Sequence, residues 1–517
     1  MSAHSTRTLL ERWSAVLMVV PLTMLFDHLF WGMEPGLNLT LFALVAMSVG
    51  LFRHGWRRVS VPARWAYAGT LLAAAMVWWH HSTVAIVAVV MGLIVFAGSV
   101  HEPALRSVPF AIPQAALAFF MAPTAGLRGV SGLRGANTTG GSGWRWVRIA
   151  VLPVLVAMAF VQLYRVGNPR FDVLTAGLFD GLFDLLGELL TPHLLFLVFA
   201  MMVCAALVRR IAPDAMHRIE HQMTDTLVRT RILRPRWMRP LSMDPLERER
   251  RAGVVLLVLV NIALMVVNVI DISWVWLGFT VPKDFSLKQF VHEGTWALIW
   301  SIMLSMLVLL YLFRRNLNFH PRNTPLKHLA TVWVVQNFIL GISVFLRNYH
   351  YISFHGLAYK RVGVIVFLAL VLIGLITLYI KVRERRSFYY LTRVNAWAWF
   401  AVLIGLTTVD WDSTIVRYNL AHDNPGEIDI DNYLAMSDKV LPLLYANLDQ
   451  VELQMARHRN NRVRWVEHLD PAEFRSELDA KRDRFMQRVE GQRWQESNAA
   501  DARTLAALKT MTYASRR

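Results

Sequence analysis

Long apolar runs recur along the first four fifths of this 517-residue chain, and they constrain its fold more than any other feature. A hydrocarbon core about 30 Å thick is crossed by roughly 20 apolar helical residues. The chain is 55% hydrophobic and 17% charged, whereas ordinary globular proteins carry about 25% charged residues. These values exclude a wholly soluble enzyme and a disordered chain. They predict an all-α fold, a polytopic transmembrane helical bundle.

We predict about eleven membrane spans from these runs. Residues 78–81 must then form a very tight hairpin between the third and fourth spans. The apolar stretch 104–122 is interrupted by Arg106, Pro109 and Pro113, so an interfacial or re-entrant piece is expected there. The approximate limits of the spans are 14–31, 36–52, 65–79, 82–99, 147–165, 192–209, 252–271, 294–313, 327–346, 362–381 and 391–408.

The distribution of Lys and Arg predicts the orientation, because these residues accumulate in cytoplasmic loops. With the N-terminus inside, 31 of the 38 Lys and Arg residues before residue 409 fall on the cytoplasmic side. Eleven of them belong to the basic loop 209–251, which we expect to contact anionic lipid. The net charge of +18 therefore reflects topology, and no nucleic-acid partner is predicted.

Composition divides the chain into four parts. Residues 1–122 are N-terminal transmembrane helices, 123–146 a Gly-rich cytoplasmic linker, and 147–408 the main transmembrane bundle. Residues 409–517 contain 18 of the 36 acidic residues but only 16 of the 54 basic ones. An odd number of spans places this solvated part outside, so we predict a small helical extracytoplasmic C-terminal domain.

The clearest helix of that domain begins at a capping box formed by Asp470 and Glu473. Glu477 and Lys481 are predicted to form an i,i+4 pair on its exposed side. Shorter helices are expected over 440–448 and 499–511. The apolar face of the first helix consists of Phe474, Leu478, Phe485 and Val489.

The sequence contains no catalytic motif of the metalloprotease, serine-hydrolase, nucleotide-binding or kinase type. Ionisable residues nevertheless gather near the predicted outer boundary. They are Asp27, His28, His80, His81, Asp271, His292, Glu293, His350, His355, Asp410 and Asp412.

Asp27, Asp271 and Arg361 are candidates for a ligand or ion pathway, because charged residues at membrane depth are costly and often functional. The alternative is interfacial placement, where a carboxylate reaches water at little cost. Asn261 and Asn268 lie seven residues apart on one helical face, so they are expected to hydrogen-bond to a neighbouring helix.

A second candidate site combines His292, Glu293, His350 and Asp410, with His80 nearby in the predicted topology. Imidazole and carboxylate form a ligand set suited to zinc. The histidines at the predicted outer boundary include no pair with the i,i+4 spacing of a helical metal site, and His350 and His355 are five apart. Zinc is therefore expected only if the chain is a metal-dependent enzyme. For the other functions no cofactor is predicted.

Several segments resemble a family of bacterial multipass membrane proteins known as a domain of unknown function. The similarity runs from about residue 170 to residue 445. It implies a protein of the bacterial cytoplasmic (inner) membrane, and it assigns no catalytic residues. The segments are NPRFDVL, NVIDISWVWLG, FSLKQFVHEGTWALI, YISFHGLAYKR, WDSTIVRYNL and IDIDNYLAMS, with weaker similarity in FDHLFWG and RWQESNAADAR.

Three functions are compatible with these features. The first is a non-enzymatic membrane protein that binds an envelope or membrane partner, or senses an envelope ligand, through its outer face and C-terminal domain. The second is a transporter of a small solute or ion. The third is a metal-dependent membrane enzyme with a site on the outer face.

Overall fold

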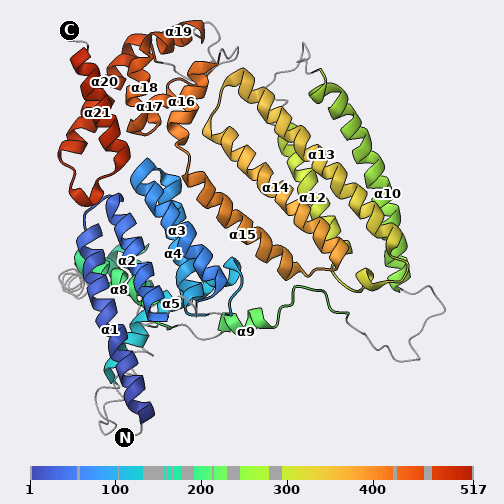
Figure 1. Ribbon diagram of the computed structural model, residues 1–517, viewed down its shortest axis with the longest axis horizontal. Coiled ribbons are helices and arrows are strands. Elements are labelled where there is room, and N and C mark those ends of the chain that lie inside the picture. The colour runs from blue at the N-terminus through green and yellow to red at the C-terminus, as the bar shows by residue number, and fades with distance from the viewer. Residues whose placement is uncertain are drawn as a thin grey trace.

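The computed structural model is helical in the residues that it describes (Figure 1). These are 3–54, 59–102, 104–131, 191–211, 215–229, 245–278, 294–422, 428–458 and 469–514, with isolated positions between 153 and 175. Within them the only strand-like pairing is one isolated bridge between Thr226 and Arg386.

Most of the long helices lie before residue 408, with the short elements α9, η2 and η4 between them. The long helices are α1 (Ala3–Phe30), α2 (Leu37–His54), α3 (Val61–His80), α4 (Thr83–Val100), α5 (Val108–Ser131), α8 (Pro192–Val208), α10 (Pro245–Asp271), α12 (Thr295–Leu312), α13 (Thr324–His355), α14 (Tyr359–Glu384) and α15 (Phe388–Thr407). The remaining elements are α9 (Ala215–His221), η2 (Ile272–Trp276), η4 (Asn316–Phe319), α16 (Trp411–Ala421), α17 (Asn432–Ala435), η5 (Asp438–Val440), α18 (Leu441–Ala446), α19 (Leu448–His458), α20 (Pro471–Glu490), η7 (Trp494–Glu496) and α21 (Ala499–Ala514).

A first bundle consists of α1 to α5, α8 and α15, which share one hydrophobic core. Small residues let its helices approach closely. A Cβ added to Gly92 of α4 would lie 2.1 Å from Oγ1 of Thr70 on α3, and one added to Gly98 would meet the backbone of Ala111 on α5. Glycine at these positions is therefore required by the packing.

A second bundle consists of α10, α12, α13 and α14, whose core includes Leu257, Leu309 and Leu375. Helix α15 joins the two bundles, because Phe400 lies in the core of the first and Leu391 in the core of the second. Figure 1 shows the bundles side by side with α15 between them.

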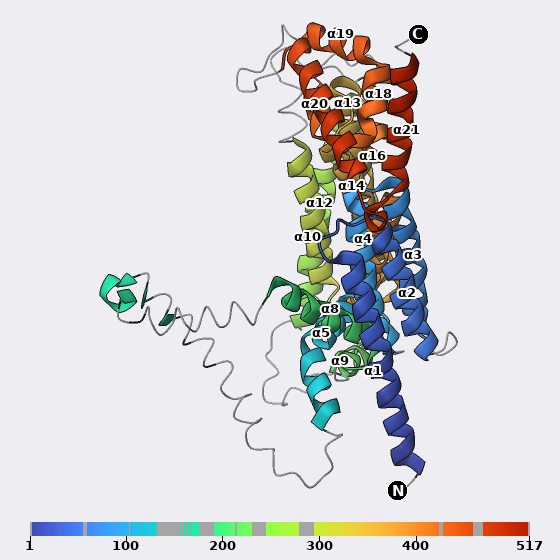
Figure 2. The ribbon, with the colours of Figure 1, turned by 90° about the vertical axis from the view of Figure 1, so that its left-hand side faces the viewer.

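Helices α16 to α21 share a third hydrophobic core, and we call residues 411–514 the C-terminal unit. Its buried centre includes Val416, Tyr433, Phe474 and Phe485. The unit lies at the end of the molecule opposite the N-terminus, the start of α10 and the short helix α9 (Figures 1 and 2).

Within the described residues, five helical segments are long and apolar enough to cross a membrane. A sixth is obtained if α15 and α16, which meet at an angle of 67°, count as one broken span. Four shorter apolar helices accompany them in α1, α2, α5 and α8. The chain is therefore an all-α polytopic membrane protein. The five segments are Thr83–Val100, Leu246–Trp276, Thr295–Leu312, Thr324–His355 and Tyr359–Glu384.

The predicted hairpin at residues 78–81 is confirmed. Helix α3 ends at His80, His81 adopts a left-handed conformation with φ of 48°, and α4 begins at Thr83. The side chain of Ser82 caps α4 by accepting a hydrogen bond from the backbone N–H of Ala85. The span predicted at 147–165 and the residues 132–146 of the linker lie largely or wholly outside the described residues.

Two expectations about helix limits are wrong. Helix α5, Val108–Ser131, covers most of the stretch 104–122, packs in the first bundle and extends past residue 123, where the linker is predicted to begin. Pro113 lies inside this helix, within its first two turns, and does not end it. The outer loop expected between Arg347 and Arg361 is largely helical, because α13 continues to His355, where Gly356 with φ of 80° ends it.

In the C-terminal unit, the capping box of Asp470 and Glu473 is confirmed, as are the helices near 440–448 and 499–511. The exposed pair of Glu477 and Lys481 is wrong. Lys481 is buried and donates to the carbonyl oxygens of Leu434 and Met436, because the chain before η5 covers that side of α20.

Candidate functional site

A polar seam joins α10 and α13, which run parallel inside the second bundle. Asn261 donates to the carbonyl of Leu329 at 3.1 Å and accepts from Nε2 of Gln336 at 2.8 Å. Seven residues further on, Asn268 donates to the carbonyl of Gln336 at 3.1 Å. The predicted interhelical role of both asparagines is confirmed, and the seven-residue repeat is that of a coiled-coil seam.

The seam ends at a buried ion pair between Asp271 of α10 and Arg347 of α13. The side chains of Asp271 and Arg347 are only 3% and 8% exposed. Among the described residues, Oδ2 of Asp271 has no hydrogen-bond partner. The backbone then widens into the π-helical turn η2, a feature frequent at functional sites. The sequence identifies Asp271 as a candidate but not Arg347, which falls in the loop predicted between the spans 327–346 and 362–381.

The C-terminal end of α13 contacts η2 and α14. Nε2 of His350 lies 3.2 Å from the carbonyl of Val275 in η2. Arg361 of α14 lies over the ring of Tyr351 at 4.6 Å and donates to the carbonyl of His355 at 2.8 Å. This turn of α13 is therefore fixed from two sides.

The α13–α14 turn is also fixed from the C-terminal unit by Asn419. Oδ1 of Asn419 accepts from the backbone N–H of Leu357, and its Nδ2 donates to the carbonyl of Leu357 at 2.9 Å. Asn419 is 1% exposed. A buried amide thus replaces the backbone hydrogen bonds that the turn leaves unmade.

A second set of interacting polar groups, which we call the junction network, consists of Tyr359, Asp410, Asp412, Ser437 and Lys439. The hydroxyls of Tyr359 and Ser437 both donate to the carboxylate of Asp412. Nζ of Lys439, whose side chain is 8% exposed, lies 2.9 Å from Asp410 and 3.4 Å from Asp412. The network therefore ties the first turn of α14 and the α15–α16 bend to η5.

Burial of Asp410 opposes its ionisation, but the ammonium group of Lys439 and the hydroxyl of Ser413 outweigh it. Together they hold the pKa of Asp410 below its ordinary value. Asp410 is consequently ionised at neutral pH, and it already has a cationic partner.

A third ionic group stabilises the interior of the C-terminal unit. Arg488 donates to Asp438 and Asp501 at 2.9 Å each, and Nδ2 of Asn498 lies 2.9 Å from Asp501. Burial raises the pKa of Asp501. The hydrogen bonds from Arg488 and Asn498 have the larger, opposite effect, so the pKa of Asp501 lies below its ordinary value. This group joins η5, α20 and α21.

The C-terminal unit also contacts the first bundle. The backbone N–H of Leu37 donates to the carbonyl of Ser497 at 3.0 Å, and a Cβ on Gly36 would lie 2.2 Å from the carbonyl oxygen of Glu496. Arg503 lies 4.5 Å from the ring centroid of Trp79 at the α3–α4 hairpin. Both bundles therefore meet the same unit.

The pathway candidates do not share a partner. Asp27 of α1 pairs with Nε2 of His193 on α8 at 2.8 Å, whereas Asp271 pairs with Arg347. Arg361 contacts backbone carbonyls and an aromatic ring beside the same end of α13 as Arg347. Asp271 and Arg361 thus belong to one region, and Asp27 to another bundle.

The metal candidates are placed only in part. Asp410 is paired with Lys439, and His350 with the carbonyl of Val275. His80 lies 3.2 Å from the carbonyl of Thr408, and His292 and Glu293 lie outside the described residues. In the described part of the chain, three or more His, Cys, Asp or Glu side chains never form a group that could hold a metal ion.

Sequence reasoning misses Lys439 and Tyr359. Both occur in segments that carry the family resemblance or adjoin it, YISFHGLAYKR and IDIDNYLAMSDK. A signal is therefore present, but nothing in the sequence indicates that these segments meet at Asp412.

Comparison with known proteins identifies one family. A domain of unknown function, DUF4153, matches residues 39–447. No curated protein and no solved structure matches the chain. The matched region contains both bundles after α1, the polar seam, the Asp271–Arg347 pair and the junction network. Since it covers well over half of the chain, the protein belongs to the DUF4153 family.

Proposed function

We propose that this protein is a non-enzymatic receptor or scaffold that binds an envelope partner or ligand through its C-terminal unit. One observation carries the proposal. The unit is held to both membrane bundles by polar contacts, at the buried Asp412 for the second bundle and at the exposed Trp79 for the first. Binding that shifts the unit would therefore act on helices that cross the membrane.

The proposed setting is the bacterial cytoplasmic membrane. About eleven spans, with the N-terminus inside and the C-terminal unit outside, agree with the charge distribution and with the position of the unit opposite the N-terminus. The basic loop 209–251 would then contact anionic lipid on the cytoplasmic side. Zinc has no role in this proposal, because Asp410 is already neutralised by Lys439.

Site-specific photo-crosslinking in intact cells tests the proposal. A photoreactive residue is introduced at Leu453 or at Trp494, which are 53% and 54% exposed on the C-terminal unit. Val228, 72% exposed at the opposite end of the molecule, is the matched control. The proposal requires a discrete adduct from the unit positions and none from Val228. Adducts from Val228 alone, or from no position, would contradict it.

A second candidate function, transport of a small ion, is favoured by the polar seam. Its buried amides and Oδ2 of Asp271, which has no hydrogen-bond partner among the described residues, form a series of polar groups along α10 and α13. Ion flux into liposomes that contain the purified protein tests this candidate. Flux that Asp271→Asn abolishes would support transport, and flux equal to that of protein-free liposomes would exclude it for the ions tested.

A further inference from the structure

An apolar groove lies between α13 and α14 on the surface of the second bundle. Its volume is about 280 Å³, close to the lower limit of about 300 Å³ for small-molecule sites. Both helices are among the segments long enough to cross the membrane. Two of its lining side chains, Val335 and Ile376, are 53% and 49% exposed, so the groove opens onto the surface that faces lipid.

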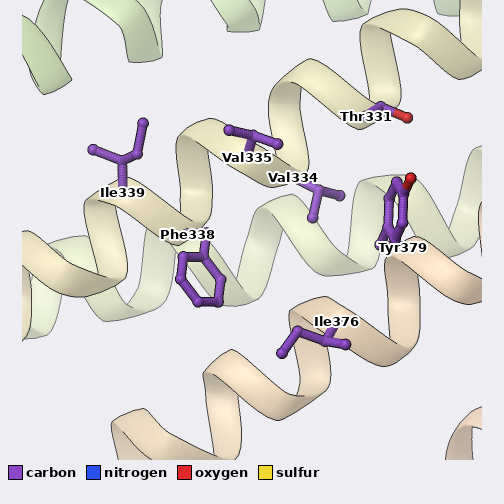
Figure 3. A pocket seen from close by; sticks show the side chains of 7 residues that line it. All are labelled: Thr331, Val334, Val335, Phe338, Ile339, Ile376 and Tyr379. Atoms are coloured by element: carbon purple, nitrogen blue, oxygen red, sulfur yellow. The ribbon is translucent and has the colours of Figure 1, made fainter.

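The groove is amphipathic along its length. Phe338 and Ile339 lie at one end, and Thr331 and Tyr379, its two residues with hydroxyl groups, lie at the other (Figure 3). A ligand that matches this gradient has a long apolar part and a polar head.

Cationic side chains follow the polar end on both helices. Lys327 and Arg383 stand one helical turn beyond Thr331 and Tyr379, and Nη1 of Arg383 donates to the hydroxyl of Tyr379 at 2.8 Å. Arg385 is close enough to Lys327 for their like charges to repel. Among the described residues, none of these three cations forms an ion pair with a carboxylate, so an anion at this position would relieve the repulsion.

We propose that this groove binds one anionic phospholipid of the bilayer. An acyl chain lies along the apolar lining, and the phosphate lies at Arg383 and Lys327. Van der Waals contact with the lining holds the chain in place, and the cations supply the preference for an anionic headgroup. The site lies at the end of α13 opposite the junction network, so it does not depend on the receptor function proposed above.

Native mass spectrometry of the full-length protein in detergent tests this inference. Phosphatidylglycerol and phosphatidylcholine with identical acyl chains are the two probes. The wild type is expected to retain one phosphatidylglycerol more tightly than phosphatidylcholine. Arg383→Gln should reduce that preference about fivefold, the effect of one cation near an anionic lipid. Equal retention of the two lipids by the wild type would overturn the proposal.

Two matched controls separate this site from general effects. Arg314 lies 3.6 Å from the ring centroid of Tyr311 just beyond the corresponding end of α12, so Arg314→Gln removes a similar cation and should leave retention unchanged. Val335→Trp fills the groove and should abolish tight retention, whereas Val332→Trp changes an exposed neighbour on α13 that does not line it. Unchanged thermal unfolding of all four variants verifies their folding. Equal losses in each matched pair would contradict the proposal.

Discussion

Asp271 of α10 and Arg347 of α13 form an ion pair inside the second bundle, where the two side chains are 3% and 8% exposed. The pair closes the polar seam that begins at Asn261 and Gln336. Removal of one buried charge leaves the other without compensation, which is more costly than removal of both.

The pair therefore predicts a strong coupling energy. Asp271→Leu alone should lower the free energy of unfolding by about 3–5 kcal/mol, and the double variant Asp271→Leu/Arg347→Met by less than the sum of the single changes. Unfolding of the purified protein in mixed detergent measures all four corners of the cycle. Glu384→Gln, which removes the exposed partner of Arg386, is the control and should cost less than about 1 kcal/mol. Additive losses would mean that the two residues act independently.

Gly356 makes a second, local prediction. Its φ of 80° is unfavourable for other residues, and a Cβ there would lie 2.6 Å from Oδ1 of Asn419. Gly356→Ala should cost about 1–3 kcal/mol, because it strains the turn and displaces the amide that holds Leu357. Heat unfolding compares it with Gly363→Ala on α14, where nothing lies within 4 Å of the added carbon and no loss is expected. Equal stability of the two variants would show that the turn does not require glycine.

The junction network predicts that removal of the charge of Asp412 weakens the attachment of the C-terminal unit to α14. Asp412→Asn weakens the contacts with Tyr359, Ser437 and Lys439 but leaves the core of the unit intact. Hydrogen exchange should increase in the first turn of α14 and in η5, while α20 stays protected. Arg475→Gln, which removes an exposed contact to Glu452 within the unit, is the control. Unchanged exchange at α14 would contradict the assigned role of the network.

Acid should weaken the contacts of Asp410 in the junction network and those of Asp501 inside the C-terminal unit. Asp410 and Asp501 have pKa values below their ordinary range, so their contribution to stability is complete above the unfolded pKa of about 3.9 and is lost as pH falls through the folded values. The protection of α16 to α21 against hydrogen exchange, measured relative to the intrinsic exchange rate at each pH, should therefore be the same at pH 7 and pH 5, and should fall below about pH 4.

The matched variant for this prediction is Lys439→Met. Loss of its ammonium leaves burial as the dominant influence on Asp410, so the acid transition should move to higher pH. A wild-type transition centred between pH 6 and 7 would assign the effect to histidines such as His80 instead.

The sequence predicts most helices of this fold because local signals define them. The capping box at Asp470, the hairpin at His81 and the heptad spacing of Asn261 and Asn268 all depend on residues close together in the chain. The helix predicted for α13 is too short, because the last three turns of α13 are rich in polar and aromatic residues that resemble an interfacial loop. In the structure these turns are helical and contact η2 and α14.

The candidate site is harder to predict, because its contacts join residues far apart in the chain. Asp271 is recognisable as a carboxylate in an apolar helix, but its partner Arg347 is 76 residues away. Lys481 fits an exposed helical face by periodicity, and it is buried because the carbonyls of Leu434 and Met436 lie over it. Helical periodicity describes one helix at a time and contains no information on what covers it.

The central claim is that the C-terminal unit lies outside the membrane, on the side opposite the basic loop 209–251. Cysteine accessibility tests this claim most directly. Cys204, the single cysteine, is buried and is first replaced by Ala. New cysteines are then placed at Arg484 of α20, whose side chain is 70% exposed, and at Thr224, which is exposed at the opposite end. We predict that a membrane-impermeant maleimide labels Arg484→Cys in intact cells and Thr224→Cys only after permeabilisation. The reverse labelling pattern would contradict the account.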